Sequence, residues 1–155
     1  MKNIWGAGIA LMLSACASTY SAPAMIAPRV SAPVQVKPAE VLRVSKRVLA
    51  GEGFQINDSD LEAGTLITAP KNFRVSTKEA DCGSTMGIDY LLDNRTTTRV
   101  SYSVIAEDGR VLVTAYVLGE YKLGDAMQDI TLTCVSKGEL DRWMLSKVLD
   151  ELGRK

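Results

Sequence analysis

The residues TTTRVSYSVIA at positions 96–106 and VLVTAYVL at positions 111–118 decide the predicted fold. In the first run, apolar residues alternate with polar ones, and the polar positions include Arg99, Ser101 and Ser103. A period of two is typical of a β-strand with one buried and one exposed face. Asp108-Gly109, between the runs, has the composition of a two-residue turn in which both positions take φ > 0. The stretch therefore predicts a central β-hairpin.

The run at positions 111–118 is apolar on both of its faces. One face is rich in valine, and the other contains Leu112, Tyr116 and Leu118. A central strand that is covered on both sides has this composition, and so does a strand whose second face is a docking surface. We expect the second face to be buried, and the docking surface is the alternative.

Two amphipathic helices are predicted to flank the strands. The first follows Pro38, which suits the first turn of a helix, and ends near Gly51 or Gly53. The sequence Ser-Lys-Gly-Glu at residues 136–139 fits a capping box, in which the serine accepts the amide hydrogen of the glutamate and the glutamate reaches back. The apolar stripe that follows predicts a closing helix that ends at Gly153.

Residues 70–85 show no periodicity and are predicted to be a loop. The remaining strand-like runs are Phe54–Asn57, Thr65–Ala69, Met86–Asp93 and Ile130–Cys134. This order predicts an α+β fold for residues 39–155. We expect two layers, with an antiparallel sheet of about five strands and the N-terminal and C-terminal helices on one face. Such an architecture is of the helix-grip or TATA-protein-like kind.

The first 15 residues have the three-part layout of a secretory signal peptide. Lys2 gives a positive charge, the run from Ile4 to Leu13 is mostly apolar, and small residues follow. The apolar run is too short to span a bilayer, because a spanning helix needs about 20 residues. We therefore expect a segment at residues 1–15 that serves for export and is removed.

Leu13-Ser14-Ala15-Cys16 resembles the lipobox of bacterial lipoproteins. The resemblance implies a diacylglycerol on the Cys16 thiol, cleavage before Cys16 and acylation of the new amino group. Since residue 17 is Ala rather than Asp, it also implies an outer-membrane destination with the domain facing the periplasm. The alternative is ordinary cleavage after Ala17, which would release a soluble periplasmic protein.

Residues 16–38 are predicted to be a lipidated cysteine followed by a tether. Prolines at 23, 28, 33 and 38 interrupt a composition of Ala, Ser and Val. Proline fixes φ and favours an extended residue before it, so the segment cannot be helical. At about 3.1 Å per residue, the tether would hold the domain as far as roughly 70 Å from the membrane.

The 155 residues include three cysteines and no histidine. With Cys16 assigned to lipid, Cys82 and Cys134 remain as a pair in an oxidising compartment, which predicts a disulfide. Free structural thiols are the alternative. The absence of histidine excludes an imidazole base, a Ser-His-Asp triad and His-ligated zinc.

No catalytic motif, cofactor motif or metal-ligand spacing is evident, so we do not expect an enzyme. The acidic residues at 58–62 begin like a calcium loop, but Ala63 and Ala69 occupy the positions that require Gly and Glu. The 18 basic and 18 acidic residues balance, which argues against a nucleic-acid partner.

The helix and hairpin predicted at residues 48–68, with Gly53-Phe54-Gln55-Ile56 and Ala63-Gly64-Thr65, resemble the opening of modules in accessory lipoproteins of the outer membrane. The nearest such family is lipoprotein C of the β-barrel assembly machine. The resemblance implies a small lipoprotein that contacts other envelope proteins, and it transfers no catalytic residues.

These observations predict a lipid-anchored, periplasm-facing interaction module, an accessory subunit of a cell-envelope complex. The candidate interaction surfaces are the free sheet face at Arg99, Ser101 and Ser103 and the loop with Asp81, Gly83 and Ser84. The alternative is a small-ligand-binding lipoprotein, because helix-grip sheets can form an apolar pocket under a helix. That pocket would be lined by Tyr90, Tyr102, Tyr116 and Trp143.

Overall fold

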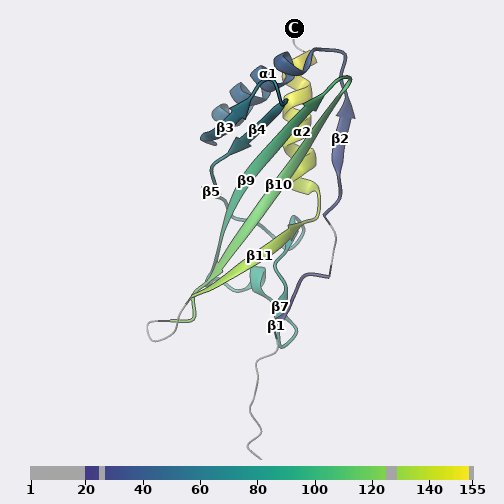
Figure 1. Ribbon diagram of the computed structural model, residues 1–155. Coiled ribbons are helices and arrows are strands. Elements are labelled where there is room, and N and C mark those ends of the chain that lie inside the picture. The colour runs from purple at the N-terminus through teal and green to yellow at the C-terminus, as the bar shows by residue number, and fades with distance from the viewer. Residues whose placement is uncertain (1–19, 25–26, 125–128, 154–155) are drawn as a thin grey trace, which may run out of the picture.

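The computed structural model describes residues 20–24, 27–124 and 129–153 (Figure 1). The main sheet has eight strands. Six of them lie in the order β3-β4-β9-β10-β11-β6, while β2 also pairs with β10 and β5 also pairs with β9. A separate small sheet has the order β1-β7-β8. The helices are α1 (Pro38–Gly51) and α2 (Glu139–Gly153).

The strands of the main sheet are β2 (Val30–Pro33), β3 (Ile56–Asp60), β4 (Thr65–Thr68), β5 (Lys71–Asn72), β6 (Ala80–Asp81), β9 (Thr96–Glu107), β10 (Arg110–Tyr121) and β11 (Ile130–Ser136). The small sheet consists of β1 (Tyr20–Ser21), β7 (Ser84–Thr85) and β8 (Ile88–Asp89), and a short 3-10 helix, η1 (Tyr90–Leu92), follows β8.

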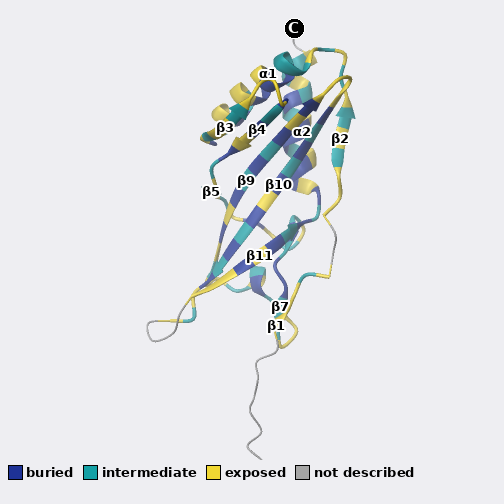
Figure 2. Cartoon of the chain, in the orientation of Figure 1, coloured by how far each residue is buried: buried dark blue, intermediate teal, exposed yellow. Residues whose placement is uncertain are grey.

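The hairpin of β9 and β10 forms the centre of the main sheet, as the alternating pattern predicts. The two strands have 12 residues each and pair along their whole length, from Glu107 and Arg110 at the turn to Thr96 and Tyr121 at the far end. Buried and exposed residues alternate along both strands (Figure 2). At the turn only Gly109 takes a positive φ, of 76°. The expectation that Asp108 does so too is wrong.

The prediction of a single antiparallel sheet of about five strands with both helices on one face, of the helix-grip or TATA-protein-like kind, is wrong. The main sheet has eight strands, and a three-stranded sheet accompanies it. The additional strands are too short for periodicity to reveal, since β5, β6, β7 and β8 have two residues each. The strand predicted at Met86–Asp93 is also interrupted. Only Ile88–Asp89 is extended, and the Asp89 carboxylate then accepts the Leu91 amide hydrogen at 2.8 Å to start η1.

Part of the predicted tether belongs to the main sheet. Val30–Pro33 forms β2 and pairs antiparallel with residues 110–113 of β10. Pro33 is tolerated because it ends an edge strand, where its missing N–H breaks no ladder. The extended conformation expected for proline-rich chain is therefore used for strand pairing.

Both helices pack against the apolar side of the main sheet and against each other (Figure 1). Helix α1 contacts β9 and β4, and α2 contacts β10 and β2. The predicted bounds of α1 and the predicted end of α2 agree with the structure. On the other side of β10, Tyr116 is exposed and Leu112 and Leu118 are only half-buried. The expectation that this strand is covered on both faces is therefore wrong.

Two strands pair with the same edge of β10, and a buried carboxylate lies at the gap between them. Strand β2 pairs with residues 110–113, and β11 pairs with residues 117–121. Between these segments, the Ala115 amide donates a hydrogen bond of 2.8 Å to Asp141 Oδ1, in the first turn of α2. The Asp141 side chain, in a residue only 1% exposed, also accepts the Ser136 hydroxyl hydrogen. The carboxylate thus satisfies a backbone donor that neither strand reaches.

The predicted capping box does not form. Ser136 Oγ accepts the Gly138 amide hydrogen at 3.1 Å, and its own hydrogen goes to Asp141. Glu139 pairs instead with Arg142 on the surface, at 2.7 Å. The serine is a cap, but its partner is the buried acid five residues later rather than the expected glutamate.

We expect Asp141→Ala to lower the free energy of unfolding by about 2–4 kcal/mol, because it leaves a buried amide and a buried hydroxyl without an acceptor. Urea unfolding followed by circular dichroism measures this loss. Glu139→Ala, which removes an exposed acid from the same turn, is the matched control and should change stability by about 0.5 kcal/mol or less. Equal losses in the two variants would contradict the role assigned to Asp141.

Candidate functional site

The candidate site is the face of the main sheet that lies opposite the helices, which we call the outer face. In β10 it carries the even-numbered residues 110–120, and in β9 the odd-numbered residues 97–107. Its exposed apolar residues are Ile67 in β4, Ile105 in β9 and Tyr116 in β10, which are 43%, 37% and 56% exposed. Among the described residues, no helix or second sheet covers them. An apolar strip is therefore open to solvent.

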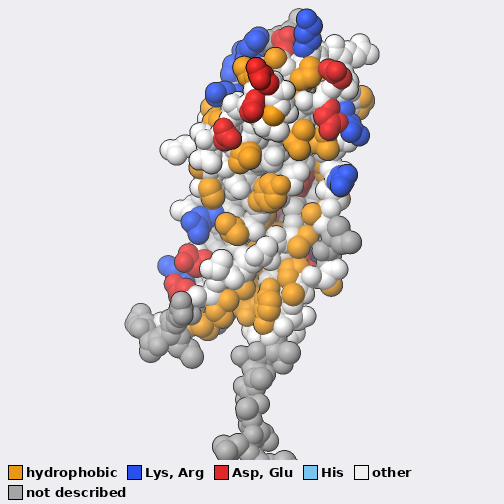
Figure 3. Space-filling model, viewed as in Figure 1, with side chains coloured by type: hydrophobic (Ala, Val, Ile, Leu, Met, Phe, Trp, Pro, Cys, Tyr) orange, Lys and Arg blue, Asp and Glu red, His pale blue; other side chains and the backbone are white. Residues whose placement is uncertain are grey.

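The strand register places these residues in a continuous strip. Ile105 lies opposite Leu112, and Ile67 lies opposite Ser103. Further along the same face, Tyr116 lies opposite Ser101, and Leu118 lies opposite Arg99. Figure 3 shows hydrophobic side chains down the middle of this face. The strip thus combines apolar side chains with small hydroxyl groups.

Charged residues lie at the turn end of the strip. Asp58 and Asp60 of β3 share the outer face with β4, since they pair with Ile67 and Thr65. Glu107 and Arg110 form an exposed ion pair of 2.6 Å beside the β9–β10 turn. An apolar centre with polar and charged residues at its margin is the usual arrangement of a protein-protein interface.

The predicted interaction residues fall into two places. Arg99, Ser101 and Ser103 lie on the outer face, as the alternation predicts. Asp81 is in β6, beside the end of β11, and its carboxylate accepts the Gly83 amide hydrogen at 2.8 Å. Ser84 begins β7 in the small sheet. The loop group is thus separate from the strip, and its members stabilise the junction between the two sheets.

The sequence predicts the apolar members of the strip only in part. Leu112 is predicted on the second face of β10, which is expected to be buried, with a docking surface as the alternative, and neither Ile67 nor Ile105 is among the predicted interaction residues. The available signal was the apolar composition of that second face. Sequence alone does not distinguish an apolar face that is covered from one that is open.

The Cys82–Cys134 disulfide predicted from the cysteine count is confirmed. It links residues 52 positions apart and joins the segment between β6 and β7 to β11. In the chain-entropy model, closing a loop of this length lowers the entropy of the unfolded chain and so raises the free energy of unfolding by about 4 kcal/mol. The bond therefore holds the small sheet to the main sheet. Cys16, the predicted lipidation site, lies outside the described residues.

Aromatic and charged side chains connect the small sheet to the far end of the central hairpin. The Tyr90 ring lies 6.0 Å from that of Tyr20 and 5.0 Å from that of Tyr121. The Arg95 guanidinium lies 4.8 Å from the centre of the Tyr121 ring and donates to Asp93 at 2.6 Å. Tyr121 also donates to Asp93, at 3.1 Å. Asp93 is thus the acceptor at the centre of this cluster.

This cluster shifts three pKa values, and the hydrogen bond to Asp93 raises that of Arg95. Hydrogen bonds from the Arg95 guanidinium and the Arg95 backbone amide hold the pKa of Asp93 well below its usual range, and the Tyr121 hydroxyl adds to this effect. Burial raises the pKa of Tyr121, and its hydrogen bond to Asp93 raises it further. The Asp93 carboxylate is therefore charged at neutral pH and serves as a structural acceptor.

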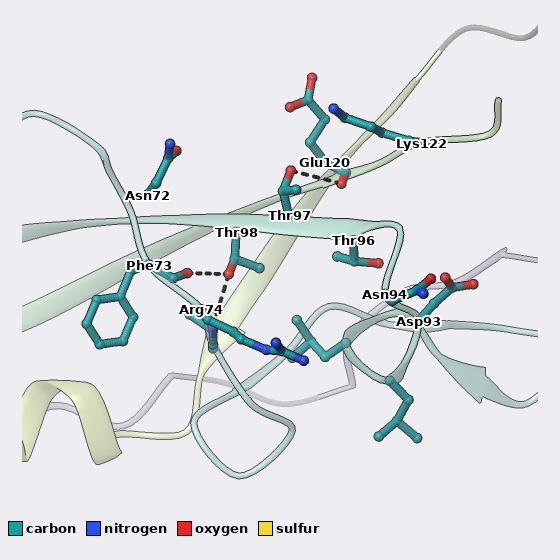
Figure 4. A pocket seen from close by; sticks show the side chains of 13 residues that line it. Asn72, Phe73, Arg74, Asp93, Asn94, Thr96, Thr97, Thr98, Glu120 and Lys122 are labelled. Carbon is teal, nitrogen blue, oxygen red and sulfur yellow. Dashed lines mark hydrogen bonds between the residues drawn. The ribbon is translucent and has the colours of Figure 1, made fainter. Parts of the chain in front are cut away.

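Two open clefts lie outside the apolar strip, and Thr97 and Glu120, at the far end of the outer face, line the first of them. The first, of about 630 Å³, lies between residues 72–75, the start of β9 and the turn after η1 (Figure 4). Arg74 extends into it, while the Thr98 hydroxyl is engaged, donating to the Phe73 carbonyl and accepting the Val75 amide hydrogen at 3.0 Å. The second, of about 830 Å³, lies beside Phe73 and Trp143. Within the described ranges, no group of three or more acidic or cysteine residues could hold a metal ion.

The four aromatic residues predicted to line a ligand pocket do not share one. Tyr102 is fully buried, stacked edge-on against Phe54 at 5.0 Å, with its hydroxyl 3.4 Å from the Leu140 carbonyl. Tyr90 belongs to the cluster at Tyr121, and Tyr116 is on the outer face. Their separation leaves the outer face as the better candidate site.

The chain matches no known protein-family model and no curated protein. Across the part of the chain that the structure describes, neither helix has both the length and the apolar character needed to cross a membrane. The functional argument therefore depends on the residues and their geometry.

We expect Asp93→Asn to destabilise the protein at neutral pH. A lowered folded-state pKa contributes stability that is present above the unfolded pKa and is lost as the pH falls toward the folded pKa. The stability difference between the wild type and Asp93→Asn should therefore be largest at pH 6 and narrow below about pH 4. Urea unfolding at several pH values measures it.

Asp108→Asn, in the exposed β9–β10 turn, is the control for loss of a carboxylate. It should follow the wild-type pH dependence closely. A difference for Asp93→Asn that stays constant from pH 6 to pH 3 would contradict the role of its ionised form.

Proposed function

We propose that this chain is a lipid-anchored interaction module of the bacterial cell envelope, an accessory subunit whose domain faces the periplasm. In this proposal acylated Cys16 holds the protein at the outer membrane, and the outer face docks a periplasm-facing envelope protein. The observation that carries the proposal is the open apolar strip on a sheet whose other face packs against the helices.

The composition of the strip favours a protein partner. Tyr116 provides a large aromatic contact with a polar end, a residue type that is enriched at protein interfaces. Ser101 and Ser103 provide hydroxyl groups beside it, and Arg99 provides a positive charge at one end. A monomer rarely keeps a contiguous apolar patch in water without using it.

The lipobox resemblance and the disulfide support the location. A disulfide forms and persists in an oxidising compartment, such as the periplasm. Lipid chains gain about 0.8 kcal/mol per buried methylene, so several chains on one cysteine bind the membrane durably. The interaction module would then act within reach of the membrane.

Labelling of cells with palmitate tests the anchor. We expect label on the wild-type protein and none on Cys16→Ser. A wild-type protein that matures to a smaller, unlabelled and soluble form would show instead that cleavage follows Ala17.

Site-specific photo-crosslinking tests the docking surface. A photoreactive phenylalanine at Tyr116 or Ile105 should capture a discrete envelope protein in intact cells, because both side chains are exposed on the strip. The same group at Arg43 or Lys46, exposed on α1, is the matched control and should capture little. Tyr116→Asp should reduce capture from Ile105 at least several-fold without a change in the urea midpoint. Equal capture from α1 and from the strip would contradict the assignment.

A further inference from the structure

The lower end of the molecule in Figure 1 presents a second apolar surface, which is distinct from the outer-face strip. It consists of Tyr20, Met86, Ile88 and Leu92, on β1, the β7–β8 turn, β8 and η1, and we call it the apolar tip. These four side chains are 47%, 84%, 62% and 72% exposed, and the last three are the most exposed large apolar residues in the described chain. No charged residue occurs between Cys82 and Ile88.

The backbone conformation at the β7–β8 turn is unfavourable for the apolar residue that occupies it. Thr85 pairs with Ile88, so Met86 and Gly87 alone form the turn, with φ values of 50° and 81°. Met86 is the only non-glycine residue with positive φ in the described ranges. This conformation is unfavourable for residues that have a Cβ atom, and glycine or asparagine is the usual residue at such turn positions. The chain keeps a strained and highly exposed methionine at this position.

The strand register places two members of the tip, Tyr20 and Ile88, on one face of the small sheet, while Met86 lies in the turn between β7 and β8 and Leu92, in η1, also lines the first cleft. Tyr20 lies opposite Thr85 in β1 and β7, and Thr85 lies opposite Ile88 in β7 and β8, so all three side chains are on the same face of the small sheet. Strand β1 comes so close to Gly83 that an added Cβ would be 2.3 Å from the Ser21 carbonyl oxygen. The disulfide at Cys82 fixes the base of this sheet. Strand pairing and the disulfide therefore hold the apolar tip in a defined conformation.

The tip is close to Cys16 along the chain. Only residues 17–19 separate Cys16 from Tyr20. Consecutive Cα atoms are 3.8 Å apart, so the Tyr20 and Cys16 Cα atoms can be at most about 15 Å apart. An acylated Cys16 would thus hold the tip at the membrane surface, not at the roughly 70 Å allowed by a free tether of residues 17–38.

We propose that the apolar tip inserts into the interfacial region of the lipid bilayer and fixes the orientation of the domain on the membrane. Methionine, isoleucine and leucine partition into the acyl boundary, and tyrosine favours the level of the headgroups. The insertion depth is the roughly 5–10 Å typical of interfacial anchors. This inference rests on the proposed lipid anchor at Cys16, and it adds a second, non-covalent membrane contact.

Depth-dependent fluorescence quenching tests the insertion. The full, acylated protein is reconstituted in phosphatidylethanolamine and phosphatidylglycerol vesicles that contain brominated lipid, in a Trp143→Phe background. We expect the tryptophan of Met86→Trp to be quenched several-fold more strongly than that of Asp108→Trp, which lies in the β9–β10 turn at the opposite end (Figure 1). Equal quenching at the two positions overturns the inference.

A second comparison, between Ile88→Trp with and without Met86→Gly, removes the Met86 side chain without straining the fold. In Ile88→Trp, the additional change Met86→Gly should weaken quenching about twofold or more. It should leave the urea midpoint unchanged or raise it, because glycine accepts a φ of 50° without strain. Unchanged quenching with Met86→Gly overturns the contribution of Met86 to insertion.

Palmitate incorporation into the same samples separates the two proposals. Normal acylation with equal quenching of Met86→Trp and Asp108→Trp overturns the insertion alone. Absence of acylation overturns the anchor and, with it, the inference that depends on it.

Discussion

The hydrogen bonds of Asp141 are the constraint on which the rest of the fold depends. Along one edge, the long strand β10 pairs with β2 at residues 110–113 and with β11 at residues 117–121, and the edge is unpaired between them. A backbone amide left there in a buried position would be costly. Asp141 accepts it from the first turn of α2, so the same carboxylate positions the helix against the sheet. Strand pairing and helix docking are fixed by one side chain.

This arrangement explains why the two faces of the sheet differ. The apolar side chains of β9 and β10 that face the helices are almost completely buried, with Val100, Tyr102 and Val104 at 0% exposure. The helices cover that face together with the segment around η1, where Tyr90 packs on Tyr121, and the apolar residues of the opposite face remain in water. The open strip is thus a consequence of a fold with two helices and a wide sheet, and its chemistry suits a partner that the chain itself does not provide.

The sequence allowed prediction of the elements with a long and regular signal. The central hairpin, α1, the end of α2 and the disulfide followed from alternation, helical spacing and the cysteine count. Elements of two residues, such as β7 and β8, carry no measurable period. The pairing of Val30–Pro33 was hidden by prolines, whose extended preference suits a tether and an edge strand equally well.

The candidate site was predicted only in part for a similar reason. The alternation placed Arg99, Ser101 and Ser103 on a free face, but the apolar residues beside them look like core residues in sequence. Burial depends on whether another layer is present, and no local pattern encodes that. Asp141 presents the reverse case, because an acid in the first turn of a helix is usually exposed and here is 1% exposed.

The position of the disulfide also has a mechanical consequence. Tension on the N-terminal end of the chain first reaches β1, whose neighbour β7 begins two residues after Cys82. From there the load passes through the covalent bond to Cys134 in β11 and is shared by the five residue pairs between β11 and β10. The backbone offers a second path, because β1 leads on to β2, which pairs with β10, and then to α1. A pull from that end is therefore shared between the covalent cross-link to β11 and the pairing of β2 with β10.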